Sequence, residues 1–499
     1  MSIRSGTKVF ILCFLAILLT FFGGAAFGAT NPYGTTITEG MWAWPGVYDN
    51  SDSNRGTIDT TDTVSDWYWG MRATDGATAL NDYRYDRRGT IITNYDYAYG
   101  MWAENGSTAE NEYLITTSGN YAYGMYGTTG SQIYNLSSRA AISTSGQWAH
   151  GMFVEGDSQA WNSDSIATAG TDAYGMLAKT GSIIRNHEGS STGSIQTVGS
   201  RSHGMVADGN GSQAWNGGDI STEGDHAYGM WATNGASINN FSSYDFLGFI
   251  PVPLLGGIDT SGFSAHGMVA DGSGSQAWNG GDISTEGDRA YGMWATGGAQ
   301  AYNVGIEIDI LGLFSLNLGG DIETTGSDSH GMVAEGVGSI VGNIGSSITT
   351  EGGSSYGMLA SGPLALAINA GSITTTSVDS YGMGAENVAL ALNLGEIETE
   401  GEAAHGMQAN NLGLAVNMKG LPDLEGLDII PLPDTLLDIL DEFGFFPGEI
   451  VTTGYGAHGL YARDFSVAAN FGDIFMKGNK PTPTACWPRT FPWLSTLAT

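Results

Sequence analysis

An internal repeat constrains this sequence more than any other feature. Residues 203–236 return almost unchanged as residues 266–299, a shift of 63 residues, with three differences between the copies. Each copy holds two smaller units, one marked by His-Gly-Met and one by Tyr-Gly-Met. A fixed period within 499 residues predicts one elongated body rather than several compact domains.

The regular unit contains three short alternating patterns. It reads Gly-x-Ile-x-Thr-x-Gly, then [Tyr/His]-Gly-Met-x-Ala, then a Gly-rich turn and [Ala/Ile]-x-Asn-x-Gly. Ile220 alternates with Thr222 and Met230 with Ala232, which is the two-residue period of β-strands. Units stacked about 4.8 Å apart would pair every strand. We therefore predict an all-β fold, a right-handed parallel β-helix (β-solenoid) of about 15 rungs and about 70 Å, with three strands per rung.

Recurrence along the chain predicts which side chains face the interior. The Met and the Ala two residues later rarely change and are expected inside, whereas the variable residue between them is expected outside. The Gly before the Met is expected to face outward or to line a tight bend. Asn ends the third strand in successive units, which predicts a buried amide ladder along the axis. The Thr hydroxyls are expected to be satisfied along the stack in a similar way.

The first 28 residues have the pattern of a secretory signal peptide. Arg4 and Lys8 precede an apolar run of about 14 residues, which is short for a membrane span of roughly 20. We expect cleavage after Ala26 or Gly28, with an uncleaved anchor as the alternative. Cleavage removes Cys13 and leaves Cys486 alone, so the fold is not expected to depend on an internal disulfide.

The remaining chain divides into irregular N-terminal rungs or a cap (29–110), a regular β-helix (111–475) and a non-repeat tail (476–499) in which nothing resembles a rung. The tail is either a poorly ordered terminus or the mark of a truncated reading frame.

Three apolar insertions, 241–256, 305–319 and 418–448, follow the Asn and should lie on one side of the solenoid. They form either a layer against its flank or a docking patch. The third contains a helix candidate, Asp434 to Phe443.

The charge is strongly acidic, with a formal net charge of -34. This repels nucleic-acid phosphates and favours a secreted or cell-surface body. The acids cluster in turns, which indicates solvated loops or weak divalent-cation binding. The nearest calcium-loop pattern, Asp208-x-Asn210-x-Ser212, has Gln213 where the sharp turn needs Gly.

Residues suited to catalysis or metal binding are better explained by the repeat. Six of the eight histidines precede Gly-Met or Gly-Leu, and intervening tyrosines place most of them about 10 Å apart, too far to share a zinc ion. Asp282 and Asp321 could align on adjacent rungs, as in a polysaccharide-cleaving β-helix, but Asp219 repeats their Gly-Gly-Asp context. We predict no catalytic, cofactor or metal site. The histidines are His150, His203, His266, His330, His405 and His458.

Outward aromatic residues are the strongest candidates for a function. Flat rings bind sugar faces or protein partners, although rings that stack across rungs can also merely stiffen a surface. Three of the six candidates follow Gly-Met in the second strand of the unit, and the other three follow Gln-Ala in the third strand. The candidate partner-binding residues are Trp102, Trp161, Trp215, Trp231, Trp278 and Trp294.

The signal sequence followed by Gly-, Asn- and Thr-rich repeats resembles the β-helical passenger of bacterial autotransporters and related hemagglutinin-like surface adhesins. The resemblance covers about residues 30–475 and carries no catalytic motif. Such proteins usually end in an outer-membrane β-barrel, whereas this sequence ends in Ser-Thr-Leu-Ala-Thr, so we expect a missing or separate barrel.

The resemblance implies a secreted or cell-surface protein that binds a host or neighbouring-cell glycan or protein in adhesion or surface structure. Its outward aromatic and acidic faces would carry that binding. The alternative is a polysaccharide lyase or hydrolase on the same scaffold, since a fold does not determine a function.

Overall fold

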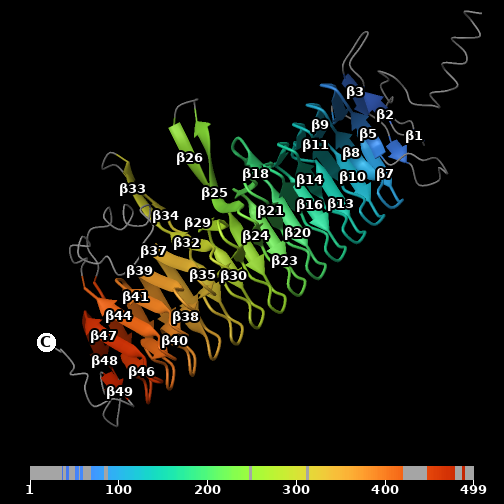
Figure 1. Cartoon of the computed structure of the whole chain (residues 1–499). Helices are drawn as coiled ribbons and strands as arrows, with labels where there is room; N and C mark the ends of the chain where they lie inside the picture. Colours follow the sequence, from blue (N-terminus) through green and yellow to red (C-terminus); the bar gives the residue numbers. More distant parts are fainter. Residues whose placement is uncertain are drawn as a thin grey trace, which may run out of the picture.

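The computed structural model confirms a right-handed parallel β-helix of about 14 turns with three strands per rung. It describes residues 36–37, 41–43, 51–54, 57–59, 69–83, 88–246, 250–310, 314–419, 447–477 and 486–488. The rungs stack in chain order along one axis, as the colours in Figure 1 show. In these ranges, no helix is long and apolar enough to cross a membrane.

One strand of each rung carries the Gly-Met pair or its equivalent, and these Met strands form a 16-stranded parallel sheet. They are β2 (Met41–Ala43), β5 (Trp69–Ala73), β8 (Tyr99–Ala103), β11 (Met125–Thr128), β14 (Met152–Glu155), β17 (Met176–Lys179), β21 (Met205–Asp208), β24 (Met230–Thr233), β28 (Met268–Asp271), β31 (Met293–Thr296), β36 (Met332–Glu335), β38 (Tyr356–Ser361), β40 (Tyr381–Glu386), β43 (Met407–Asn410), β46 (Leu460–Ala462) and β49 (Cys486–Pro488).

The other two strands of each rung form the second sheet, joined at the corner after the Asn. The Ile strands are β1 (Thr36–Ile37), β4 (Thr57–Asp59), β7 (Thr90–Thr93), β10 (Leu114–Thr117), β13 (Ala141–Thr144), β16 (Ser165–Thr168), β20 (Ser194–Thr197), β23 (Asp219–Thr222), β27 (Gly257–Thr260), β30 (Ile283–Thr285), β35 (Ile322–Thr324), β42 (Glu396–Thr399), β45 (Glu449–Thr452) and β48 (Asp473–Met476). The Asn strands are β3 (Ser51–Asn54), β6 (Thr78–Asn81), β9 (Thr108–Asn111), β12 (Gln132–Asn135), β15 (Gln159–Asn162), β18 (Ile183–Glu188), β22 (Gln213–Asn216), β25 (Ser237–Phe246), β29 (Gln276–Asn279), β32 (Gln300–Val304), β41 (Leu390–Asn393), β44 (Leu414–Met418) and β47 (Val467–Phe471). Two long strands, β37 (Ile340–Thr350) and β39 (Leu366–Thr375), run through the corner. Each supplies both the Asn strand of one rung and the Ile strand that follows it.

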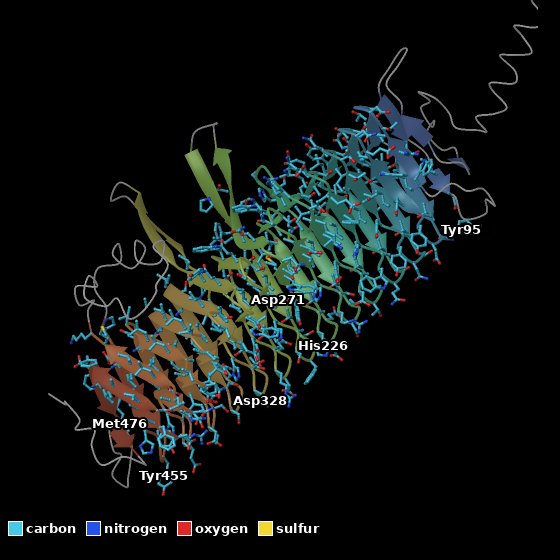
Figure 2. All side chains as sticks on the ribbon, viewed as in Figure 1. Tyr95, His226, Asp271, Asp328, Tyr455 and Met476 are labelled. Atoms are coloured by element: carbon cyan, nitrogen blue, oxygen red, sulfur yellow. The ribbon has the colours of Figure 1, made fainter. Side chains whose placement is uncertain are left out.

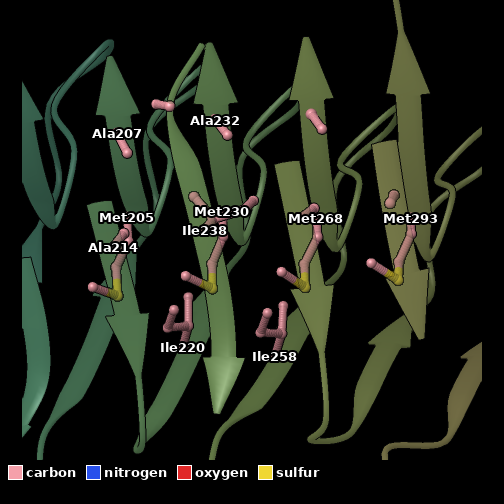
Figure 3. Close-up of a cluster of buried hydrophobic side chains, with 14 of the residues drawn as sticks. Met205, Ala207, Ala214, Ile220, Met230, Ala232, Ile238, Ile258, Met268 and Met293 are labelled. Atoms are coloured by element: carbon pink, nitrogen blue, oxygen red, sulfur yellow. The ribbon is translucent and has the colours of Figure 1, made fainter. Parts of the chain in front are cut away.

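The core is a set of columns in which like residues pair across rungs. Met205 aligns with Met230 and Ala207 with Ala232, and all four are fully buried. Figure 3 shows the side chains of Met205 and Met230 beside Ile220 and Ile258, which come from the facing sheet. Burying each Met or Ile contributes about 1.5–3 kcal/mol, so the continuous core stabilises rungs that could not fold singly.

The predicted Asn column forms an unbroken amide ladder. Each Asn donates from Nδ2 to Oδ1 of the Asn on the next rung at 2.7–3.0 Å. The ladder begins three rungs earlier than the regular sequence pattern suggests. Its members are Asn54, Asn81, Asn111, Asn135, Asn162, Asn186, Asn216, Asn240, Asn279, Asn303, Asn343, Asn369, Asn393, Asn417 and Asn470.

Two expectations about the interior were met only in part. Most of the Thr hydroxyls donate to a carbonyl in the turn that follows their own strand, as Thr222 Oγ1 does to the Ala227 carbonyl at 2.8 Å. Thr452 Oγ1 instead donates to Met476 on the next rung, and Thr350 Oγ1 and Thr375 Oγ1 have no partner among the described residues. The Gly before each Met is buried, and most of these glycines lie at a bend, which confirms the second of the two alternatives and not the outward one. A Cβ on Gly229 would lie 2.3 Å from Ile258 Cγ2 and 2.6 Å from the Gly267 carbonyl, so only Gly fits there.

Two of the insertions form antiparallel hairpins on one side of the solenoid, as expected from their position after the Asn (Figure 1). They pair β25 with β26 (Ile250–Leu255) and β33 (Ile306–Ile310) with β34 (Phe314–Leu318). A shorter hairpin, β18 with β19 (Ser191–Thr192), stands at the same corner and was missed from the sequence. Ser242 Oγ lies 2.5 Å from His187 Nε2, so the β18–β19 and β25–β26 hairpins are in contact at their bases.

The tail contributes one strand that the sequence did not predict. Leu460 pairs with Cys486 and Ala462 with Pro488 in parallel register, which continues the Met sheet by one strand. The signal peptide and the helix candidate Asp434 to Phe443 lie outside the described residues.

Candidate binding surface

A continuous column of Tyr and His rings covers the outer face of the Met sheet. The His150 ring lies 5.2 Å from Tyr123 and 4.7 Å from Tyr174, and the column continues through His203. His405 and His458 are adjacent at 4.9 Å, the one consecutive pair that the sequence predicted. The histidines of this column therefore stack on rings of the neighbouring rungs.

The buried histidines of this column also accept a backbone hydrogen bond. The Nδ1 atom of His203 accepts the backbone N–H of Tyr228 on the next rung at 2.9 Å, and His150 and His266 do the same for Tyr174 and Tyr291. Burial lowers the pKa of His203 to about 3, with smaller contributions from neighbouring cationic groups. A neutral ring is required because a protonated Nδ1 could not accept this bond.

The residue after each Met points away from the core, as expected from the sequence, but neighbouring side chains cover several of these residues. Phe153, Leu177 and Val206 form a small outer cluster and are at most 8% exposed. The rings of Tyr123 and Tyr174 pack against this cluster and exclude water from it. The outer face of the Met sheet is thus a second, thinner apolar layer.

Three of the six predicted tryptophans lie in this layer and are half-buried. The Arg72 guanidinium lies 4.1 Å from the ring centroid of Trp102. Trp231 packs edge-on against His203 at 5.0 Å, and Trp294 packs in the same way against His266. Their faces are therefore partly covered by neighbours.

The other three tryptophans lie on the Asn strands, on a different face of the solenoid, and are also half-buried. Trp161 stacks on Tyr134 at 4.6 Å, and Trp278 lies 4.6 Å from Tyr302. Trp215 donates from Nε1 to Gln213 and meets Phe241 edge-on. The six residues form two tracks, one on each side of the turn that joins a Met strand to an Asn strand.

The acidic turns use their carboxylates to connect rungs. Asp282 and Asp321 are adjacent, as predicted, and Asp282 Oδ1 accepts the backbone N–H of Asp321 at 3.1 Å. Asp208 of the calcium-like pattern accepts Asn234 Nδ2 at 2.7 Å and lies 3.6 Å from Lys179. In the part of the chain that the structure describes, no three His, Cys, Asp or Glu side chains converge as metal ligands would.

A groove of about 470 Å³ opens beside these turns. Asp321, Ser347, Ser372 and Glu396 contribute its polar groups, and glycines form much of its floor. The carboxylates of Asp321 and Glu396, which come from different rungs, face this shared space.

Sequence reasoning missed an aromatic stack on the turn between the Ile and Met strands, the first turn. The Tyr97 and Tyr121 rings lie 5.0 Å apart and parallel, and Trp148 continues the stack at 6.3 Å. All three residues have a left-handed backbone, with φ of 55–62°. Figure 2 shows the edge on which this turn lies, marked by Tyr95 and Tyr455. The signal in the sequence was a bulky residue at the turn position that other rungs fill with Asp, Arg or Ser.

Comparison with known proteins gives one family match and one solved structure. A family described as the BigA third pectate lyase-like domain matches residues 119–243 and 312–421, slightly under half of the chain. The cryo-EM structure of the Vag8–C1 inhibitor complex is similar with a TM-score of 0.47 at 16% identity, and the alignment covers 91% of this chain and 100% of that chain. No curated protein matches. The words "pectate lyase-like" describe a fold and not an activity.

Proposed function

We propose that this chain is an exported β-helical passenger of the autotransporter type that acts at the cell surface by binding rather than by catalysis. The family match over the regular rungs supports the passenger assignment. A formal charge of -34 is compatible with a body exposed to solvent and opposes nucleic-acid binding. Export depends on the signal peptide expected in residues 1–28.

One observation carries the non-catalytic part of the proposal. The side chains that could do chemistry accept backbone N–H groups from the next rung, as His203 does from Tyr228 and Asp282 from Asp321. A general base engaged in this way is neither free to rotate nor able to accept a substrate proton without breaking the stack. The outward aromatic tracks, by contrast, extend along many rungs and suit an elongated glycan or a protein surface.

Binding through the aromatic tracks can be tested with the secreted protein on a glycan array and on cultured cells. We expect Trp215→Ala combined with Trp278→Ala to lower retention at least tenfold if the Asn-strand track binds. The matched control is Trp148→Asn, which removes a half-buried ring from another edge. Unchanged binding in the double variant, and in a second variant lacking Trp231 and Trp294, would exclude both tracks.

A polysaccharide-degrading enzyme is the second candidate, and the groove beside Asp321 is the observation that favours it. Two carboxylates on opposite sides of a glycosidic bond are the usual requirement for its hydrolysis. Release of oligosaccharides from pectate or other acidic and neutral polysaccharides, abolished by Asp282→Asn with Asp321→Asn, would establish an enzyme and overturn the binding-only proposal.

A further inference from the structure

The second turn, which joins each Met strand to its Asn strand, changes character along the solenoid. Toward the N-terminus its tip holds Gly, Asn, Asp or Ser, as at Asn210 and Ser273. On five successive rungs toward the C-terminus the tip is aliphatic or aromatic and 52–70% exposed. These five residues, called the apolar ridge below, are Val337, Leu364, Val388, Leu412 and Phe465.

The apolar ridge is contiguous because neighbouring tips are hydrogen-bonded. Leu364 N–H donates to the Val388 carbonyl at 3.4 Å, and Leu412 N–H donates to the Asp464 carbonyl at 3.1 Å. With rungs about 4.8 Å apart, five tips make a row of about 19 Å. A contiguous exposed apolar surface of this kind is typical of an interaction site rather than of scattered surface residues.

The backbone shows that these residues are not there to stabilise the turn. Leu364, Val388, Leu412 and Phe465 have φ of 61°, 71°, 66° and 64°. This left-handed conformation is unfavourable for side chains other than Gly, Asn or Asp, and most unfavourable for β-branched Val388. Because the tips are exposed, no core burial offsets this cost. Asn or Gly would form the same turn with less backbone strain.

The surroundings of the apolar ridge define the partner. Glu335 and Glu386 end the Met strands beside it, and Asp464 precedes Phe465 in the last tip, where Arg463 lies 3.8 Å from Asp464. The flanks are therefore mainly acidic, and a second copy with the same flanks and a charge of -34 would be repelled. An α-helix presents one apolar row per 5.4 Å turn, close to the rung spacing.

We propose that the apolar ridge docks an amphipathic, basic α-helix of a partner protein. Its apolar stripe would lie along the five tips, and its Lys or Arg residues would face Glu335, Glu386 and Asp464. The proposal does not depend on the tryptophan tracks, because the ridge lies C-terminal to Trp294 and includes no tryptophan.

The test uses the mature full-length protein and a synthetic 18-residue Leu/Lys amphipathic helix as the probe, with binding followed by fluorescence anisotropy. The ridge variant is Leu364→Asn, Val388→Asn, Leu412→Asn and Phe465→Asn. Since Asn suits positive φ, this variant should fold with unchanged or higher thermal stability. The control variant replaces two residues exposed elsewhere, Val198→Asn and Phe263→Asn, each 43% exposed in the native protein.

We expect the ridge variant to lose at least tenfold in affinity for the peptide and the control variant to lose less than twofold. Neither variant changes a charge, so purely electrostatic binding to the acidic body would be equal in all three proteins, and that result would overturn the proposal. Equal binding of a Leu/Glu peptide with the same pattern would refute the basic-partner assignment. Self-association of the native protein that the ridge variant abolishes would identify a second copy as the occupant and refute the proposal.

Discussion

The Asn ladder makes the most quantitative prediction, and Asn216→Ala tests it at one rung. Asn216 Oδ1 accepts Asn186 Nδ2 at 2.8 Å, and Asn216 Nδ2 donates to Asn240 Oδ1 at 2.8 Å. Alanine removes both bonds, each worth about 1 kcal/mol net. It also leaves Asn240 Oδ1 buried without that donor, which costs about 1–3 kcal/mol more. The expected loss of stability is therefore about 3–5 kcal/mol.

The measurement combines urea unfolding with hydrogen exchange of peptides from the rungs around Asn216, because a solenoid need not unfold in one step. The matched control is Gln196→Ala, which removes an exposed amide bonded to Glu223 and should cost under about 0.5 kcal/mol. A loss below about 1 kcal/mol for Asn216→Ala, or a loss equal to that of the control, would refute the claim that the ladder stabilises the stack.

Three further predictions follow from the interior and the His column. Burial depresses the pKa of His203 to about 3 in the folded protein, against about 6.5 in the unfolded chain. The contribution of His203 to the free energy of unfolding is therefore complete above pH 6.5 and falls as the pH drops, by about 2 kcal/mol at pH 5. The free energy of unfolding should depend less steeply on acid pH in His203→Phe than in the native protein. Gly229→Ala should lower the free energy of unfolding by several kcal/mol, because the added Cβ would overlap Ile258. Gly76→Ala is the control: no atom lies within 4 Å of its Cβ position, but its φ is +82°, so it should cost about 1 kcal/mol. Urea unfolding measures both. Thr222→Val should cost about 1 kcal/mol locally and leave neighbouring rungs unchanged in hydrogen exchange, because its bond is to Ala227 of its own turn.

The interior could be predicted from the sequence because its chemistry recurs. A Met, Ala or Asn that faces the axis contacts the same residue type on the rungs above and below, as Met205 contacts Met230. The repeat therefore predicts the surroundings of these side chains. The direction of the Thr222 hydroxyl bond was not predictable, because recurrence shows that a position is polar and buried but not whether its partner lies in the next rung or in its own turn.

The outer surface could be predicted only in part. Sequence alternation correctly placed the six tryptophans outside the core, but not their coverage by neighbouring rings, because that depends on residues one rung away with different identities. Val206 shows the limit: it points outward and yet is 2% exposed, since Tyr174 and Trp231 pack around its cluster.

The difference between the recurring core columns and the variable outer residues explains how one scaffold can carry different surfaces along its length. The Met, Ile and Asn columns fix the backbone of every rung, so a turn tip can change from Ser273 to Leu412 without altering the strands beside it. Toward the N-terminus the first turn carries the stack of Tyr97, Tyr121 and Trp148, and toward the C-terminus the second turn carries the apolar ridge. Because the tips tolerate substitution that the columns do not, variants that alter binding should concentrate at tips, and variants that alter folding at columns. A binding defect that maps to a column residue such as Asn216 should therefore always be accompanied by a loss of stability.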